Sequence, residues 1–99
     1  VLDEAFALRD TADDVLIVRH GLLTDTSIAN IALWDGSEWY TPAQPLLAGT
    51  QRRYLLDTGQ IKETDIPVAS LGNYRHIRLF NALIPFGEVE LPVGQIRMY

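Results

Sequence analysis

The sequence predicts one α/β (α+β) domain in which short β-strands alternate with short helices. Strand-like runs rich in apolar and β-branched residues recur along the chain, as at residues 15–18, 28–34 and 74–80. Helix-like segments are expected at residues 2–9 and 51–58. With 99 residues, 47% of them hydrophobic, the chain is long enough for a single domain with a modest core.

The first forty residues are predicted to form a helix followed by strands. Apolar residues at positions 2, 5, 6 and 8 recur at helical spacing, which predicts an amphipathic helix over residues 2–9. Because no capping residue precedes it, we expect the natural chain to continue upstream. Asp13-Asp14 ends the helical pattern, and the run at 15–18 predicts a strand that is buried on both faces. A turn at His20-Gly21 and a hairpin turn at Asp35-Gly36 then predict a small antiparallel meander.

The second half of the chain is predicted to begin with a loop and a helix. Thr50 is the expected N-cap of the helix at residues 51–58, and Gly59 is its expected stop. Polar and apolar residues alternate before Pro67, and a helical turn is expected near Ser70. A strand over residues 74–80 and an extended edge segment over residues 89–96 complete the expected elements.

Charge and composition exclude several kinds of partner. The net charge of −5 repels phosphate backbones and anionic lipid, so neither nucleic acid nor a membrane is expected as a partner. The chain has no cysteine, which excludes disulfides and thiolate metal sites and fits a cytoplasmic protein. His20 and His76 lack metal-ligand spacing with any acidic residue, so no metal site is expected.

Three segments carry polar groups that could bind a ligand. The stretch from Gly21 to Gly36 offers Asp25 and Asn30, although Asp25 could instead bond the local backbone at a strand end. Gly49-Thr50 stands where a helix should start, so its N–H groups and the helix dipole could bind an anion. An ordinary helix cap would give the same dipeptide. Asn81 is either a further ligand donor or a turn residue that supports the following loop.

These segments together resemble one family. The run Gly21-Leu-Leu-Thr-Asp-Thr-Ser, with Asn30, Gly49-Thr50 and Asn81-Ala82, is similar to the C-terminal half of class IV aminotransferases. That family of pyridoxal-phosphate enzymes includes aminodeoxychorismate lyase and the branched-chain and D-amino acid aminotransferases. The resemblance implies a D-amino acid aminotransferase-like fold with a mixed sheet, and it makes residues 1–99 a cofactor-binding C-terminal domain or fragment.

The resemblance also implies roles for individual residues. Asp25 corresponds to the acid beside the pyridine nitrogen of pyridoxal 5'-phosphate, where the family usually has glutamate. Asn30 would also bind the cofactor, and its phosphate would be held by Gly49-Thr50 and Asn81-Ala82. The Schiff-base lysine is expected upstream of Val1, because the single lysine of the chain, Lys62, lies in a polar stretch and should face water.

The expected function follows from the resemblance. A complete protein would be a pyridoxal-phosphate-dependent aminotransferase or 4-amino-4-deoxychorismate lyase acting on an amino acid or aminodeoxychorismate. Its N-terminal half or a companion chain would supply the lysine, so this chain alone is expected to be inactive, and the family implies a homodimer. The alternative is a noncatalytic α/β binding or assembly module that retains the family fold. A longer parent chain with a lysine just before Val1, detected by intact mass, would favour the enzyme.

Overall fold

The computed structural model describes residues 2–8, 15–26 and 29–98 of the chain, and the side chains of residues 16–26 and 29–94. The strands form two sheets. Sheet A has the order β3-β2-β1-β9 and consists of β1 (Leu2–Leu8), β2 (Val15–Arg19), β3 (Leu22–Thr26) and β9 (Ile96–Met98). Sheet B has the order β6-β5-β4-β7-β8 and consists of β4 (Asn30–Trp34), β5 (Trp39–Pro42), β6 (Lys62–Thr64), β7 (His76–Phe80) and β8 (Val89–Pro92). The helical segments are α1 (Thr50–Asp57) and two 3-10 helices, η2 (Val68–Asn73) and η3 (Val93–Gln95).

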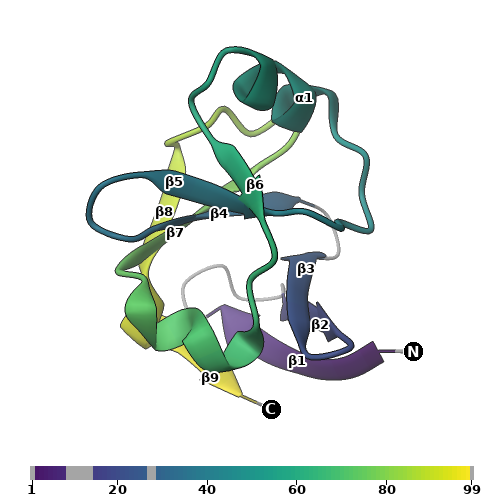
Figure 1. Cartoon of the computed structure of the whole chain (residues 1–99), viewed down its shortest axis with the longest axis vertical. Helices are drawn as coiled ribbons and strands as arrows, with labels where there is room; N and C mark the ends of the chain where they lie inside the picture. The colour runs from purple at the N-terminus through teal and green to yellow at the C-terminus, as the bar shows by residue number, and fades with distance from the viewer. Residues whose placement is uncertain (1, 9–14, 27–28, 99) are drawn as a thin grey trace.

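The elements are stacked in three layers with sheet B in the middle. Helix α1 lies against one face of sheet B, and β1, β2 and β3 lie on the other side (Figure 1). Sheet B is mixed, because β6 pairs with β5 in parallel whereas β4, β5, β7 and β8 pair antiparallel. This confirms the mixed sheet with short helices that the sequence led us to expect. Among the helices of the described residues, none is long and apolar enough to cross a lipid bilayer.

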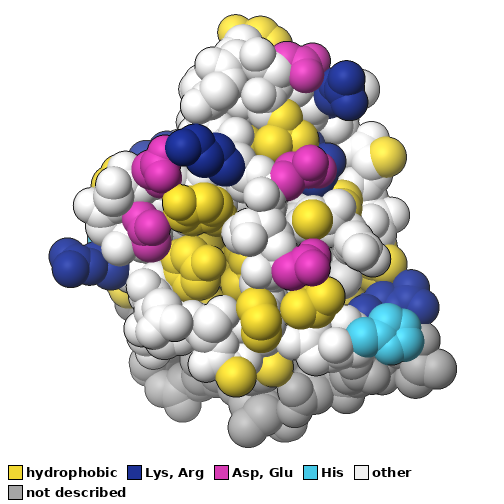
Figure 2. Space-filling model, viewed as in Figure 1, with side chains coloured by type: hydrophobic (Ala, Val, Ile, Leu, Met, Phe, Trp, Pro, Cys, Tyr) yellow, Lys and Arg dark blue, Asp and Glu magenta, His cyan; other side chains and the backbone are white. Residues whose placement is uncertain are grey.

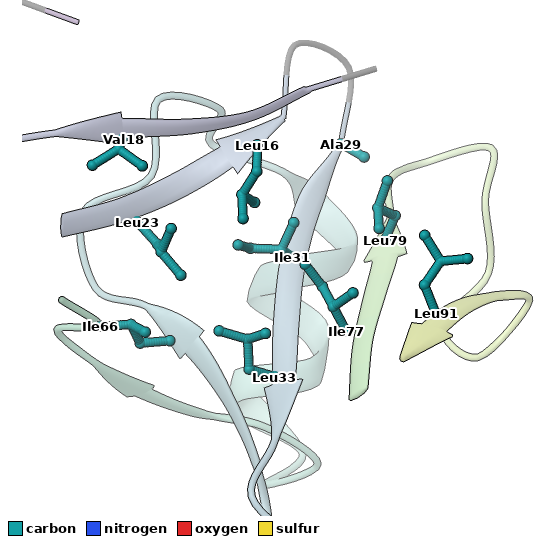
Figure 3. Packing of buried hydrophobic residues seen from close by; sticks show 10 residues of the cluster. All are labelled: Leu16, Val18, Leu23, Ala29, Ile31, Leu33, Ile66, Ile77, Leu79 and Leu91. Carbon is teal, nitrogen blue, oxygen red and sulfur yellow. The ribbon is translucent and has the colours of Figure 1, made fainter. Parts of the chain in front are cut away.

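The larger hydrophobic core fills the space between the two sheets. Side chains from β2 and β3 meet side chains from β4, β7 and β8, and Figure 3 shows Leu23, Ile31 and Leu33 directed into the same space. Alternating residues of β4 face this core, as strand geometry requires. The buried members are Leu16, Val18, Leu23, Ala29, Ile31, Leu33, Ile66, Ile77, Leu79 and Leu91.

A smaller core lies on the opposite face of sheet B, beneath α1. Phe80 and Ala32 from the sheet are buried against Leu55 of α1 and Ile61. The ring of Phe86 completes this core, because it meets Phe80 edge-on with ring centroids 5.4 Å apart. Strand β4 therefore buries both of its faces, which explains why its sequence is almost continuously apolar.

Backbone hydrogen bonds join the two sheets through the segment that precedes η2. The N–H of Leu23 donates to the carbonyl of Ile66 at 2.8 Å, and the N–H of Val68 donates to the carbonyl of Gly21 at 2.8 Å. Leu22 and Pro67 form an antiparallel bridge between these two bonds. Strand β3 is thus paired on both sides, with β2 on one and with this segment on the other.

The prediction of a helix over residues 2–9 is wrong, because the structure has strand β1 at Leu2–Leu8. The apolar residues at positions 2, 6 and 8 also fit a period of two, so the sequence pattern is compatible with a strand. β1 pairs antiparallel with both β2 and β9, and it thereby satisfies backbone groups that two sheet edges would otherwise leave unpaired. The predicted break at residues 13 and 14 lies outside the described residues.

Four other expectations need correction. Within β2, Leu16 and Val18 are buried but Ile17 is only half-buried, so this strand is not enclosed on both faces. The expected meander is divided between the sheets, because β3 pairs with β2 whereas β4 pairs with β5 and β7. Gly49, not Thr50, is the N-cap residue of α1. The strand expected from residue 28 begins at Asn30, and residue 28 itself lies outside the described part of the chain.

The hairpin predicted at Asp35-Gly36 is confirmed. One carboxylate oxygen of Asp35 accepts hydrogen bonds from the N–H groups of Ser37 and Glu38, each at 2.8 Å. Gly36 has a φ of +105°, which side chains other than glycine rarely adopt. The predicted helical turn near Ser70 lies within η2, and the predicted edge segment is divided into β8, η3 and β9.

Candidate functional site

Asp25 lies at an irregularity in strand β3. Leu16 pairs with Thr26 and Val18 pairs with Leu23, so two residues of β3, Thr24 and Asp25, stand opposite one residue of β2. Such a β-bulge turns the strand locally and changes the direction of its side chains. The Thr24 hydroxyl donates to the carbonyl of Ile17 at 3.0 Å and so satisfies a backbone group at the bulge. Both bulge residues are buried.

The side chains of Asp25 and Asn30 hold the backbone of Leu47 from both sides. Oδ2 of Asp25 accepts a hydrogen bond from the Leu47 N–H at 2.7 Å. Nδ2 of Asn30 donates to the Leu47 carbonyl at 2.9 Å. Two residues from the strand pair thus fix the loop at residues 46–49, immediately before α1, although they lie 22 and 17 positions away in sequence.

Gly49 is in close contact with Asn30. A Cβ added to Gly49 would lie 2.2 Å from Oδ1 of Asn30, a distance that real structures do not allow. The backbone angles of Gly49, φ −73° and ψ 140°, are available to any residue, so the requirement for glycine here is steric. Because Asn30 is itself buried and bonded to Leu47, its side chain cannot move aside without losing that bond. The structure therefore brings Asp25, Asn30 and Gly49 into one cluster.

Asp25 is a buried acid, and one of its two carboxylate oxygens, Oδ2, accepts the hydrogen bond from Leu47. Its side chain has no exposed surface, and Oδ1 has no hydrogen-bond partner among the described residues. Burial raises the pKa of this carboxyl above its usual value of 3.8. This rise is opposed, in decreasing order, by the hydrogen bond from Leu47, the Thr24 hydroxyl, the Leu46 backbone and the positive charge of Arg52. A cationic group beside Oδ1 would stabilise the carboxylate. Since the side chain is enclosed, a ligand can reach Oδ1 only if neighbouring segments move apart.

The N-terminus of α1 follows directly from this cluster. None of the described side chains caps it, and its first turn contains no acidic residue. The first N–H groups of a helix have no partner within it, and together with the helix dipole they favour an anion. Thr50, the first residue of the helix, is exposed. A basic residue next to a helix start often faces solvent, but the side chain of Arg52 is only 13% exposed. Its Nη2 bonds Glu63 at 2.5 Å and the Pro42 carbonyl at 3.1 Å.

Asn81 begins the loop that follows β7, and its side chain stabilises that loop. Oδ1 of Asn81 accepts hydrogen bonds from the N–H groups of Leu83 at 2.7 Å and Ile84 at 2.8 Å. The turn alternative for Asn81 is therefore realised in the structure. Ala82 is exposed in the same loop. The loop is attached to the first turn of α1 through the side chain of Gln51, which bonds the backbone of residues 81, 84 and 86.

The predicted site residues thus lie around one end of α1. Asp25, Asn30 and Gly49 are in direct or bridged contact through Leu47, and the loop of Asn81 is reached through Gln51 (a contact partner that the sequence did not indicate). Leu47 was missed because it binds through its backbone, which leaves no trace in residue type. Gln51 was missed because its contacts span 30 to 35 positions of sequence.

Charged residues outside this cluster form local ion pairs. Lys62 is 57% exposed and pairs with Glu38, as expected for a lysine that faces water. Acidic and basic side chains lie beside one another over the face shown in Figure 2, around a group of hydrophobic side chains. Within the part of the chain that the structure describes, no three His, Cys, Asp or Glu side chains converge as metal ligands.

Comparison with known proteins identifies the family. Residues 1–91 match the family model for amino-transferase class IV, so the chain belongs to the class IV aminotransferases. A protein of Haemophilus influenzae with no assigned function is 40% identical over 83 residues, which cover 84% of this chain and 44% of that protein. The aminodeoxychorismate lyase of Saccharomyces cerevisiae is 41% identical over 73 residues, covering 67% of this chain and 20% of the yeast protein. The chain therefore spans less than half the length of these relatives.

Solved structures show the same fold. The crystal structure of a provisionally assigned 4-amino-4-deoxychorismate lyase from Haemophilus somnus matches with a TM-score of 0.70 and 40% identity, over 76% of this chain and 39% of that one. An aminotransferase from Brucella abortus bound to pyridoxal phosphate matches with a TM-score of 0.61 over 86% of this chain and 34% of that one. At 18% identity, that second likeness shows the fold alone.

Proposed function

We propose that this chain is the cofactor-binding C-terminal part of a pyridoxal-phosphate enzyme that acts on a small amino compound, as an aminotransferase or an aminodeoxychorismate lyase. The observation that carries the proposal is Oδ1 of the buried Asp25, which has no hydrogen-bond partner in the described part of the chain and lies in one cluster with the N-terminus of α1. An acid and a set of anion-binding N–H groups are two of the groups that this cofactor requires from a protein.

The residues of the cluster fit the cofactor in distinct ways. Asp25 would hold a proton on the pyridine nitrogen, because a carboxylate a few ångströms away favours the cationic ring. Gly49 and Thr50 would bind the phosphate through their N–H groups, and Asn30 would keep the preceding loop in place through Leu47. Bound pyridoxal phosphate supplies a conjugated ring that accepts electron density from the substrate.

Other parts of the active site would come from outside this chain. Lys62 is exposed and paired with Glu38, so we assign the Schiff-base lysine to polypeptide upstream of Val1 or to a companion chain. The proposal includes a homodimer, as the family resemblance implies, and a location in the cytoplasm, which the absence of cysteine favours. Lyases and aminotransferases of this family need the same protein groups around pyridoxal phosphate. The cluster of Asp25, Asn30 and Gly49 would therefore serve either reaction.

The proposal is tested on the complete protein. Mixing it with pyridoxal phosphate should give a visible absorption band, and borohydride reduction should fix the cofactor to one lysine. Peptide mapping should place that lysine outside residues 1–99 and leave Lys62 unlabelled. A protein that gives no band, or that is labelled at Lys62, would contradict the proposal.

A further inference from the structure

The side chain of Gln51 joins two segments that are distant in sequence. Its Nε2 donates to the carbonyls of Asn81 and, at 2.9 Å, Ile84. Its Oε1 accepts a hydrogen bond from the N–H of Phe86 at 2.7 Å. A single amide group in the first turn of α1 therefore bonds three backbone groups of the loop at residues 81–86.

These contacts fix the orientation of the amide. Both Nε2 protons point at carbonyls and Oε1 points at an N–H, so a rotation by 180° would oppose like groups at all three positions. No charged side chain of similar length can reproduce the pattern, since glutamate has no donor and lysine has no acceptor. The loop side of the contact is organised as well, because Asn81 bonds the N–H groups of Leu83 and Ile84.

We propose that Gln51 is a positioning residue that sets the spacing between the N-terminus of α1 and the loop at residues 81–86. This inference rests on the proposed function, in which Gly49 and Thr50 bind the cofactor phosphate, and on the family resemblance, which implies that Asn81-Ala82 contact the same phosphate. Gln51 immediately follows the first segment and bonds the backbone of the second. None of these three hydrogen bonds of Gln51 involves Asp25, the acid proposed to lie beside the pyridine nitrogen, or Leu47, which Asp25 bonds.

The role predicts an effect that depends on the phosphate group. Pyridoxal phosphate uses both segments, whereas pyridoxal forms the same bond with the lysine but has no phosphate. In the complete protein, Gln51→Met should weaken binding of pyridoxal phosphate about tenfold, equivalent to ~1.4 kcal/mol. Binding of pyridoxal should change less than about twofold, equivalent to ~0.4 kcal/mol. Both dissociation constants are measured by titration of the visible absorption band.

Gln60→Met is the matched control. Gln60 is exposed, lies just beyond the same helix, and donates to the hydroxyl of Thr58 at 3.0 Å. This variant should bind both ligands as the wild-type protein does. If Gln51→Met does not fold, Gln51→Ala takes its place, because it removes the same three hydrogen bonds without adding a charge near the phosphate.

The outcomes separate this inference from the proposed function. Equal weakening of both ligands by the Gln51 variant would mean a general structural role, and unchanged affinity for pyridoxal phosphate would mean no role; either result overturns the inference alone. A wild-type protein that binds neither ligand overturns the proposed function and the inference with it. Selective loss of the phosphate-bearing ligand, with Gln60→Met unaffected, supports the assignment.

Discussion

Replacement of Gly49 by alanine tests the geometry of the candidate site most directly. At a residue with φ −73° and ψ 140°, Gly→Ala normally stabilises a protein by about 0.4–1 kcal/mol, because it restricts the unfolded chain. Here the new Cβ would lie 2.2 Å from Oδ1 of Asn30. We therefore expect Gly49→Ala to destabilise the protein, which is the opposite sign.

The magnitude follows from what must move. Displacing Asn30 breaks its hydrogen bond to the Leu47 carbonyl, a loss of about 1 kcal/mol, and overpacking adds ~1–3 kcal/mol. After the entropic gain is subtracted, a net loss of about 1–3.6 kcal/mol in the free energy of unfolding is expected. In an Asn30→Ala background the obstacle is gone, so the added cost of Gly49→Ala should fall below about 0.5 kcal/mol, a coupling that only contacting residues show.

The assay is urea denaturation of the cofactor-free complete protein for the wild type, both single variants and the double variant. Gly72→Ala serves as the control, because a Cβ at Gly72 would meet no described atom within 4 Å. It should leave stability unchanged or raise it slightly. The reasoning is refuted if Gly49→Ala stabilises the wild type, or if its cost is the same with and without the Asn30 side chain.

Two further predictions concern buried polar groups. Burial raises the folded-state pKa of Asp25 above its usual value of 3.8. The contribution of Asp25 to stability is therefore fully present below about pH 3.8 and is lost as the pH rises through its folded-state pKa. Asp25→Asn should therefore gain thermal stability relative to wild type as pH rises, unlike the exposed control Asp57→Asn; a growing loss would contradict this. The Thr41 hydroxyl donates to the Ile31 carbonyl at 2.7 Å, so Thr41→Val should cost about 1 kcal/mol and lower the urea midpoint without changing the m-value. Thr64→Val should change the midpoint little, and equal effects would argue against the Thr41 bond.

Local sequence signals predicted the elements whose structure is decided locally. The hairpin at Asp35-Gly36 depends on a carboxylate that bonds the next two N–H groups and on a glycine with positive φ, and both are visible in residue type. Strand β4 was predicted from its apolar run because burial on both faces permits no polar alternation. Helix α1 ends at Asp57, one residue before the expected end at residue 58.

Other features depend on distant partners, and the sequence could not predict them. The residues of β1 fit two periods, and pairing with β2 and β9 decides between them. The bulge that presents Asp25 arises from the register between β2 and β3, which residue types alone do not specify. The sequence named Asp25, Asn30 and Gly49 as site residues, but their meeting point is the backbone of Leu47, where any side chain could stand.

The pairing of β3 with the segment at residues 66–68 restricts where the chain can change in length. The side chain of Ile66 is buried in the larger core while its carbonyl accepts a hydrogen bond from Leu23 of β3, so an inserted residue there would rotate the buried side chain outward. The turn after α1 is constrained in a different way, because the N–H of Gly59 donates to the carbonyl of Leu56 and Gly59 has a φ of +75°. Natural variants of this domain should therefore keep a constant spacing between Ile66 and Val68.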